Sequence, residues 1–262
     1  MTTPVLSAHD LTVRFGGQQP VDALRDVTLE LGAGEILALV GGSGSGKTTL
    51  ARCLLGLLRP DAGEVRVDGR PLGYGAARLR GHRRQVQLVP QDPAGSLNPR
   101  HPVAWAVAEG LNIHRFPRAG LPDRVAAALA EVGLSPPGRF LPARPRELSI
   151  GQQQRVALAA ALALAPRVLV ADEPLSALDP PARADTLALL LRLRAIRALS
   201  VLLITHDLAA AWQAADRLAV LHHGTLAESG PVESVLRSPR HPATRALLAA
   251  ATRPLPRRPQ LP

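Results

Sequence analysis

Hydrophobic and polar positions follow several distinct patterns along the 262 residues of the chain. In residues 1 to about 38, apolar side chains occupy alternate positions, as at Leu11, Val13 and Phe15, and this period of two predicts an antiparallel β layer. Short continuous apolar runs predict buried strands of a parallel sheet, because both faces of such a sheet are covered. Buried strands are expected at 35–40, 167–171 and 201–204, with further strands at 63–69 and 85–89 and a strand pair within 217–230.

A helical pattern replaces the strands between about 92 and 155. Apolar spacing predicts a helix over Leu121–Val132, with Asp123 near its start, and several prolines interrupt the pattern on either side. A second amphipathic helix over Arg183–Arg197 is explained by packing against the core. We therefore predict one α/β domain over residues 1–251 with an inserted helical subdomain at about 92–155. Pro and Arg dominate residues 252–262, which are expected to be disordered.

Composition limits the compartment and the class of partner. The chain has one cysteine, Cys53, so an internal disulfide and a cysteine-only metal site are excluded. The first ten residues contain no apolar signal segment, and no apolar run approaches the roughly 20 residues that span a bilayer. We therefore expect a soluble protein of the cytoplasm. The net charge of +10 comes almost wholly from arginine, and its basic stretches lack interleaved aromatic residues, so nucleic acid is not expected as a partner.

The single lysine lies in a phosphate-binding motif. Lys47 follows a glycine-rich loop and precedes Thr48 in the pattern G-x-x-x-x-G-K-[ST], between a predicted strand and a predicted helix. Glycines allow the amides to turn inward, and the helix N-terminus adds a partial positive charge. Lys47 would neutralise the β- and γ-phosphates, and Thr48 would offer its hydroxyl to Mg²⁺. The predicted nucleotide-binding residues of this segment are Gly41, Gly42, Ser43, Gly44, Ser45, Gly46, Lys47, Thr48 and Thr49.

Two carboxylates and a histidine follow the predicted buried strands. Asp172 and Glu173 end the strand at 167–171, and His206 comes directly after the strand at 201–204. Parallel strands present such residues at the carboxyl edge of the sheet, where α/β proteins bind ligands. We expect Asp172 to hold Mg²⁺ and Glu173 to polarise the water that attacks a γ-phosphate, with His206 contacting that phosphate.

The order of these motifs resembles that of the ATP-binding subunits of ABC transporters over nearly the whole chain. The segment Leu148-Ser-Ile-Gly-Gln152 resembles the LSGGQ signature of this family, and Gln91 resembles the glutamine of its Q-loop, which contacts Mg²⁺. The segment Ser176-Ala-Leu-Asp179 resembles the D-loop, His206 resembles the switch histidine, and Phe15 matches the aromatic residue that stacks on adenine.

This resemblance implies a P-loop NTPase (RecA-like) core with an antiparallel β subdomain and a helical subdomain. It also implies a head-to-tail dimer with a second ATPase subunit, identical or different, in which Ser149, Gly151, Gln152 and Asp179 reach the nucleotide across the interface. The expected cofactors are ATP and Mg²⁺. The implied partners are transmembrane permease subunits and, indirectly, a solute-binding protein, which places the chain peripherally at the cytoplasmic face of the inner membrane.

A narrower resemblance concerns the cargo. The segment Gln91–Arg100 (QDPAGSLNPR) and the late segment Ser238–Leu248 (SPRHPATRALL) resemble the ATPases of oligopeptide, dipeptide and nickel importers. The implied function is ATP hydrolysis that drives uptake of peptides or nickel-like solutes. A subunit of a phosphonate-degrading (C–P lyase) complex is an alternative. An ABC-type ATPase of nucleic-acid maintenance is a weaker one, because the chain has no room for a coiled-coil insertion.

Three positions depart from the family pattern. Ile150 replaces a glycine of the signature, Ala160 stands where arginine is usual, and Ala94 stands where tyrosine is usual. A β-branched residue at 150 cannot take the positive φ values open to glycine, and it adds bulk beside the partner's phosphate. One hypothesis is that the chain works beside a different ATPase subunit whose site is completed by this altered signature. The alternative is that Ile150 is tolerated without consequence.

Overall fold

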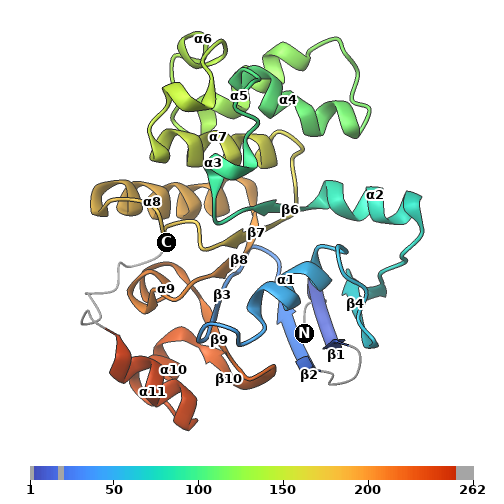
Figure 1. Ribbon diagram of the computed structural model, residues 1–262, viewed down its shortest axis with the longest axis vertical. Helices are drawn as coiled ribbons and strands as arrows, with labels where there is room; N and C mark the ends of the chain where they lie inside the picture. Colours follow the sequence, from blue (N-terminus) through green and yellow to red (C-terminus); the bar gives the residue numbers. More distant parts are fainter. Residues whose placement is uncertain (1–2, 17–20, 252–262) are drawn as a thin grey trace.

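The computed structural model describes residues 3–16 and 21–251, and the predicted disordered segment 252–262 lies outside them. Two sheets and an all-helical lobe make up this part of the chain (Figure 1). The first sheet has the order β2-β1-β4-β5, with antiparallel neighbours throughout. Its strands are β1 (Leu6–Phe15), β2 (Val21–Leu31), β4 (Ala62–Val67) and β5 (Arg70–Pro71). This is the antiparallel β layer that the alternating pattern predicts.

The second sheet has six strands in the order β10-β9-β3-β8-β7-β6. All neighbours are parallel except β9 and β10, which form the expected antiparallel pair at the edge. The strands are β3 (Ile36–Val40), β6 (Val86–Val89), β7 (Val168–Asp172), β8 (Ser200–Ile204), β9 (Arg217–His222) and β10 (Thr225–Pro231). The strands expected at 35–40, 85–89, 167–171 and 201–204 thus correspond to β3, β6, β7 and β8, which lie side by side in one sheet.

Hydrophobic side chains cover both faces of the central sheet. Along β3, Ile36, Ala38 and Val40 belong to one core, whereas Leu37 and Leu39 belong to the other. The first core includes the helices of the lobe, and the second includes α1 (Lys47–Leu54) and the antiparallel sheet. Because alternate side chains of a strand point to opposite faces, a run that is apolar at every position is needed here.

The helical lobe is inserted between β6 and β7 and lies at the top of Figure 1. It contains α3 (Pro93–Ser96), α4 (Val103–Ile113), α5 (Leu121–Glu131), α6 (Pro137–Phe140), a short 3-10 turn (Pro145–Glu147) and α7 (Ile150–Leu162). The predicted helix at 121–132 corresponds to α5. Helix α7 leads from the lobe back to the core, so it extends past residue 155.

The remaining helices flank the sheets. They are α2 (Ala76–Gln85), α8 (Pro180–Arg197), α9 (Leu208–Ala214), α10 (Val232–Arg237) and α11 (Pro242–Ala250). The end of α8 is tied to the lobe, since Arg197 forms an ion pair with Glu131 at the end of α5 and donates to the Leu162 carbonyl at 3.1 Å. Within the described ranges, no helix is both long and apolar enough to cross a membrane.

Candidate active site at the carboxyl edge of the central sheet

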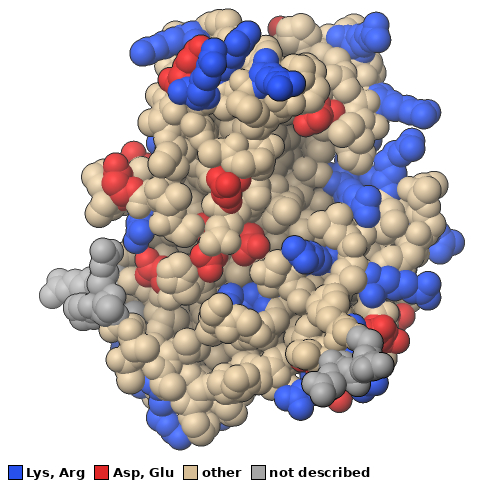
Figure 2. All heavy atoms as spheres, viewed as in Figure 1, with Lys and Arg blue, Asp and Glu red and all other residues tan. Residues whose placement is uncertain are grey.

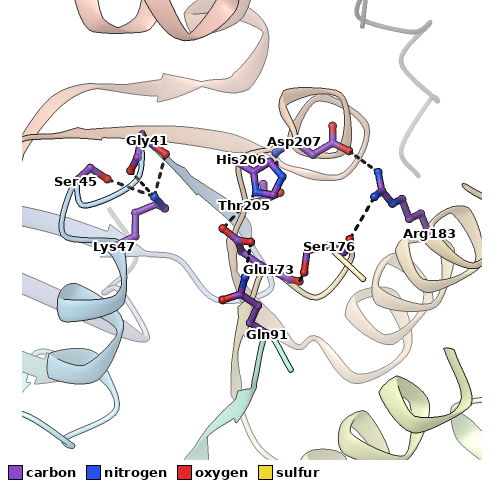
Figure 3. A network of polar contacts seen from close by, with 11 residues as sticks. Gly41, Ser45, Lys47, Gln91, Glu173, Ser176, Arg183, Thr205, His206 and Asp207 are labelled. Atoms are coloured by element: carbon purple, nitrogen blue, oxygen red, sulfur yellow. Dashed lines mark hydrogen bonds and ion pairs between the residues drawn. The ribbon is translucent and has the colours of Figure 1, made fainter. Parts of the chain in front are cut away.

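Four parallel strands bring the predicted reactive side chains to one edge. The phosphate-binding loop follows β3, Gln91 follows β6, Asp172 and Glu173 end or follow β7, and His206 follows β8. These strands are neighbours in the order β3-β8-β7-β6. Figure 3 shows the result, with Lys47 on one side of the group and Gln91, Glu173 and His206 together on the other.

The phosphate-binding loop is packed against two strands from elsewhere in the chain. A Cβ atom on Gly41 would lie 2.2 Å from the Leu221 carbonyl oxygen of β9, so only glycine fits there. Gly46 has a φ of 106° and would place a Cβ atom 2.5 Å from the Ala23 carbonyl oxygen of β2. The Ser45 carbonyl accepts the Gly224 amide at 3.0 Å. The loop is therefore held by β2 and by the turn between β9 and β10.

Lys47 turns its ammonium into this loop. Its Nζ donates to the carbonyl oxygens of Gly41 at 2.9 Å and Gly42 at 2.8 Å, and to Ser45 Oγ at 3.4 Å. Burial lowers the pKa of Lys47, and the charges of Glu173 and Asp172 act in the opposite direction. A partly desolvated ammonium attracts an incoming anion more strongly than one in water.

Asp172 carries an electrostatic cost. Burial raises the pKa of Asp172, and repulsion from Glu173 raises it further, whereas the charges of Lys47 and Arg52 lower it. A carboxylate held in this way gains from a nearby cation. Its position at the end of β7 therefore suits a magnesium ligand.

Glu173 is at the centre of the polar group. Its Oε2 accepts a hydrogen bond from Gln91 Nε2 at 2.9 Å, and its Oε1 lies 3.3 Å from His206 Nδ1 (Figure 3). The backbone of Glu173 has a φ of 45°, a left-handed conformation that is costly for a residue with a side chain. The Glu173 amide donates to the Ile204 carbonyl of β8 at 2.9 Å, which fixes the residue between the two strands.

The signature residues lie in the helical lobe, at the start of α7. Ser149 caps this helix: its Oγ accepts the Gln152 amide at 3.2 Å, and Gln152 Oε1 accepts the Ser149 amide at 3.0 Å. Gly151 lies in the first turn between them. Ile150 is the first helical residue, has no positive φ, and is 50% exposed. The backbone at this position therefore does not need the positive φ that a β-branched residue cannot take, and only the added bulk remains.

The remaining predicted site residues are exposed or half-buried. Asp179 caps α8 by accepting the Ala182 amide at 2.8 Å, and Ser43 and Gly44 face solvent, whereas Thr48 and Thr49 lie in the first turn of α1. Phe15 is 45% exposed at the end of β1 and pairs with Val21 of β2, close to the segment of β2 that contacts Gly46. Phe15 thus lies opposite the same strand, β2, that contacts the phosphate-binding loop. The side-chain hydrogen bonds of Ser149 and Asp179 are those that cap α7 and α8.

The charge distribution on this face suits a negatively charged ligand that binds together with a cation. Figure 2 shows acidic side chains gathered over the middle of this face, while most basic side chains lie around the rim. In the described part of the chain no group of three or more His, Cys, Asp or Glu residues could hold a metal ion by itself. A magnesium ion would have to share Thr48, Gln91 and Asp172 with oxygens of a bound phosphate.

Sequence reasoning missed one residue of this group. The periodicity places Arg183 only in an amphipathic helix, yet its guanidinium contacts the loop after Glu173 and faces Asp207 (Figure 3). One feature of the sequence could have indicated a role for Arg183. It lies near the start of a predicted helix, where the helix dipole disfavours positive charge, so an arginine there needs acceptors from elsewhere.

The sequence also matches a known protein family and several known proteins. A family model described as "ABC transporter" matches residues 24–176. The oligopeptide transport ATP-binding protein OppF of Streptococcus pyogenes serotype M1 is 37% identical over 261 residues, covering 98% of this chain and 84% of that protein. The glutathione import ATP-binding protein GsiA of Salmonella paratyphi A is 38% identical over 257 residues, which cover 94% of this chain and 41% of that protein.

Solved structures show the same fold. The structure of cbiO1 from Clostridium perfringens, part of the ABC transporter complex cbiONQ, has a TM-score of 0.81 at 27% identity and covers 90% of this chain and 92% of its own. The ATP-binding cassette MJ0796, solved as a dimer in a post-hydrolysis state bound to ADP and Pi, has a TM-score of 0.78 at 29% identity. That match covers 87% of this chain and 98% of MJ0796.

Proposed function

Because the chain belongs to the ABC transporter family, as an ATP-hydrolysing subunit of the importer type, we propose that it drives uptake of oligopeptides or similar solutes through separate membrane subunits. The observation that carries this proposal is the convergence of Lys47, Gln91, Glu173 and His206 at the edge formed by β3, β6, β7 and β8. The relatives are an oligopeptide transport protein and a glutathione import protein, which favours a peptide cargo over a nickel-like one and import over phosphonate breakdown.

The phosphate-binding loop grips the triphosphate of ATP. The ammonium of Lys47 exchanges its contacts with the Gly41 and Gly42 carbonyls for phosphate oxygens. Amides of the loop and of the first turn of α1 add donors and the positive end of the helix dipole. Phe15, exposed on the neighbouring strand, offers its ring to the adenine.

The donor set fits magnesium. Thr48 supplies a hydroxyl oxygen, Gln91 an amide oxygen and Asp172 a carboxylate, and all three are hard oxygen ligands of the kind Mg²⁺ prefers. Gln91 already donates through its Nε2 to Glu173, which leaves its Oε1 for the metal. When bound, Mg²⁺ neutralises charge on the β- and γ-phosphates.

Glu173 orients the attacking water. Its carboxylate accepts a proton or a hydrogen bond from the water, while Gln91 and His206 fix its two oxygens. His206 is the more exposed partner of this pair, 66% against 19% for Glu173, so its ring could contact the γ-phosphate. No covalent intermediate is required, since the groups act by position and charge.

A second subunit completes each site. Ser149 and Gly151 lie at the N-terminus of α7 in the helical lobe, and we propose that they contact the nucleotide of a partner in a head-to-tail dimer. Asp179 takes part at the same interface. The exposed Ile150 side chain then faces the partner's nucleotide. The partner is either a second copy or a different ATPase, and the permease subunits would hold the assembly at the cytoplasmic face of the membrane.

Two substitutions test the proposal. Lys47→Ala should abolish ATP binding, because it removes the only ammonium in the loop. Glu173→Gln should keep ATP binding and stop hydrolysis, since the amide preserves shape but not basicity, and it should trap an ATP-bound dimer. Equilibrium titration with Mg·ATP, phosphate release and gel filtration measure the three effects.

The results distinguish the proposal from a structural role. Wild-type protein that binds no adenine nucleotide, or a Glu173→Gln variant that hydrolyses ATP at the wild-type rate, would overturn it. To separate the two kinds of dimer, this chain is given the Glu173→Gln substitution, the partner ATPase is left unchanged, and the two proteins are co-purified. Complete loss of turnover shows that this chain's own site is the working one.

A further inference from the structure

Arg183 joins two loops that each carry a residue of the active site. Its Nε donates to the Leu178 carbonyl at 2.8 Å and one Nη donates to the Ser176 carbonyl at 3.4 Å. The other Nη lies 4.0 Å from Asp207 Oδ2. Figure 3 shows the guanidinium of Arg183 between the loop after Glu173 and the turn after His206.

The first of these loops begins at Glu173 and is hydrogen-bonded along its length. The Glu173 carbonyl accepts both the amide of Ser176 at 3.1 Å and its Oγ at 3.0 Å. The Leu178 amide donates to the Leu175 carbonyl at 3.3 Å, and the loop ends at the α8 cap. Through these hydrogen bonds, a shift of the Ser176 and Leu178 carbonyls would also displace the backbone of Glu173. The left-handed conformation of Glu173 is costly, so it depends on such contacts.

The second loop carries His206 and is fixed through Asp207. Asp207 Oδ1 accepts the amides of Ala209 and Ala210 at 2.9 and 3.1 Å, which caps α9, and the Asp207 amide donates to Thr205 Oγ1 at 3.0 Å. One carboxylate oxygen thus holds the helix and the other faces Arg183. His206 lies between these anchored residues.

The side chains of Arg183 and Asp207 are 32% and 26% exposed, so their pairing is only partly screened by water. Arg183 also lies one turn into α8, where the helix dipole opposes its charge. The two carbonyls and the carboxylate offset this repulsion. The guanidinium is suited to the task, because its planar fork can serve three acceptors at once.

We propose that Arg183 is a positioning residue for ATP hydrolysis, which links the Glu173 loop to the His206 turn and so sets the geometry of the Glu173–His206 pair. The inference rests on the roles proposed above for Glu173 and His206. Arg183 acts through these residues, and its contacts lie on the Glu173 loop and Asp207 rather than on the phosphate-binding loop. It should therefore govern the rate of hydrolysis and leave nucleotide affinity alone.

The experiment compares Arg183→Met with a matched arginine of the same helix. Arg194 also donates to a carbonyl, that of Gly34 at 2.8 Å, and pairs with an aspartate, Asp216, at 3.1 Å, but at the opposite edge of the sheet. Arg183→Met should lower kcat at least about tenfold, since small displacements of reacting groups have large effects on rate. The Kd for Mg·ATP should stay within about twofold of wild type, and Arg194→Met should leave both quantities unchanged.

Conservative variants separate positioning from stability. Arg183→Lys should restore part of kcat, because one ammonium keeps the charge but cannot reach both carbonyls and Asp207. Asp207→Asn keeps the α9 cap and removes the charge. The double variant Arg183→Met, Asp207→Asn should then be no slower than the slower single variant, as expected for residues that act as a unit.

Amide hydrogen exchange of the nucleotide-free chains reports on the link itself. The amides of Glu173, Ser176 and Leu178 should exchange faster in Arg183→Met than in Arg194→Met. An unchanged kcat or unchanged exchange in Arg183→Met, or an equal loss of kcat in Arg194→Met, would overturn the inference. If wild-type protein binds and hydrolyses no ATP, the proposed function fails; faster exchange then still supports the loop link, and unchanged exchange rejects it.

Discussion

Gly41→Ala tests whether the phosphate-binding loop is held by packing on a distant strand. The added methyl group would lie 2.2 Å from the Leu221 carbonyl oxygen and 2.7 Å from Ser45 Oγ. Atoms of this kind do not approach below about 3.0 Å. The oxygen belongs to β9, which is paired with β3 and β10 on its two sides, so it cannot move away cheaply. The loop itself must shift.

The size of the effect follows from this geometry. Overpacking of a well-packed site costs about 1–3 kcal/mol, and contact with backbone places Gly41→Ala in the upper part, at about 2–3 kcal/mol. A protein of this size loses roughly 2–4 °C of Tm per kcal/mol, so the Tm should fall by about 4–12 °C. Thermal unfolding followed by circular dichroism without nucleotide measures it.

Neighbouring glycines provide controls within the same loop. A methyl group on Gly42 would meet no atom within 4 Å, and this residue has no positive φ, so Gly42→Ala should change stability by less than about 0.5 kcal/mol. Gly44 is equally open but has a φ of 72°, so Gly44→Ala should cost about 1 kcal/mol through backbone strain alone. If Gly41→Ala unfolds at the same temperature as Gly42→Ala, the loop is not seated on β9 and the reasoning is refuted.

Two further predictions concern carboxylates with opposite pKa shifts. Burial raises the pKa of Glu228, but hydrogen bonds from Thr244 Oγ1 and the amides of Arg240 and His241 outweigh it and give a lowered pKa. The ionised Glu228 therefore stabilises the fold above its usual pKa of 4.5, and this effect is lost as the pH falls through the lower pKa of the folded state. In urea unfolding, Glu228→Gln should lower the free energy of unfolding by about 1 kcal/mol at pH 7 and by less at pH 3. A cost that does not change with pH would contradict this. Asp172 has a raised pKa, so its charge opposes folding at neutral pH, and Asp172→Asn should stabilise the nucleotide-free chain by about 0.5–2 kcal/mol at pH 7 in the same assay. Equal or lower stability of Asp172→Asn would show that attraction to Lys47 and Arg52 dominates.

The edge that carries the site was predictable because it depends on local patterns. A continuous apolar run fixes a buried strand, and the polar residue that follows must lie at the end of that strand. For this reason Lys47, Asp172, Glu173 and His206 could be placed from sequence, together with the strands that carry them. The antiparallel layer followed in the same way from its period of two.

Features that depend on long-range packing were not predictable. The motif assigns Gly41 to phosphate binding, whereas the immediate demand for glycine comes from Leu221, far along the chain. The contacts of Arg183 join three segments of the chain, and the sequence offers only the unusual place of an arginine one turn into a helix, without its acceptors. The sequence shows that Ile150 cannot take the positive φ values open to glycine, but not whether position 150 needs them; in the structure a serine cap lets the helix begin at residue 150 without a positive φ. In each case a neighbour supplied by the fold decides the outcome.

Two charged groups of the site lie where a bound ligand of opposite charge would favour them. Burial lowers the pKa of Lys47 and raises that of Asp172, so both groups lie in surroundings that disfavour their charged forms. Glu173 has a left-handed backbone conformation at the same edge. A phosphate beside Lys47 and a cation beside Asp172 would favour both charges at once. Nucleotide and Mg²⁺ together should therefore raise the free energy of unfolding more than either does alone. The phosphates compensate the charge of Lys47, and Mg²⁺ compensates that of Asp172.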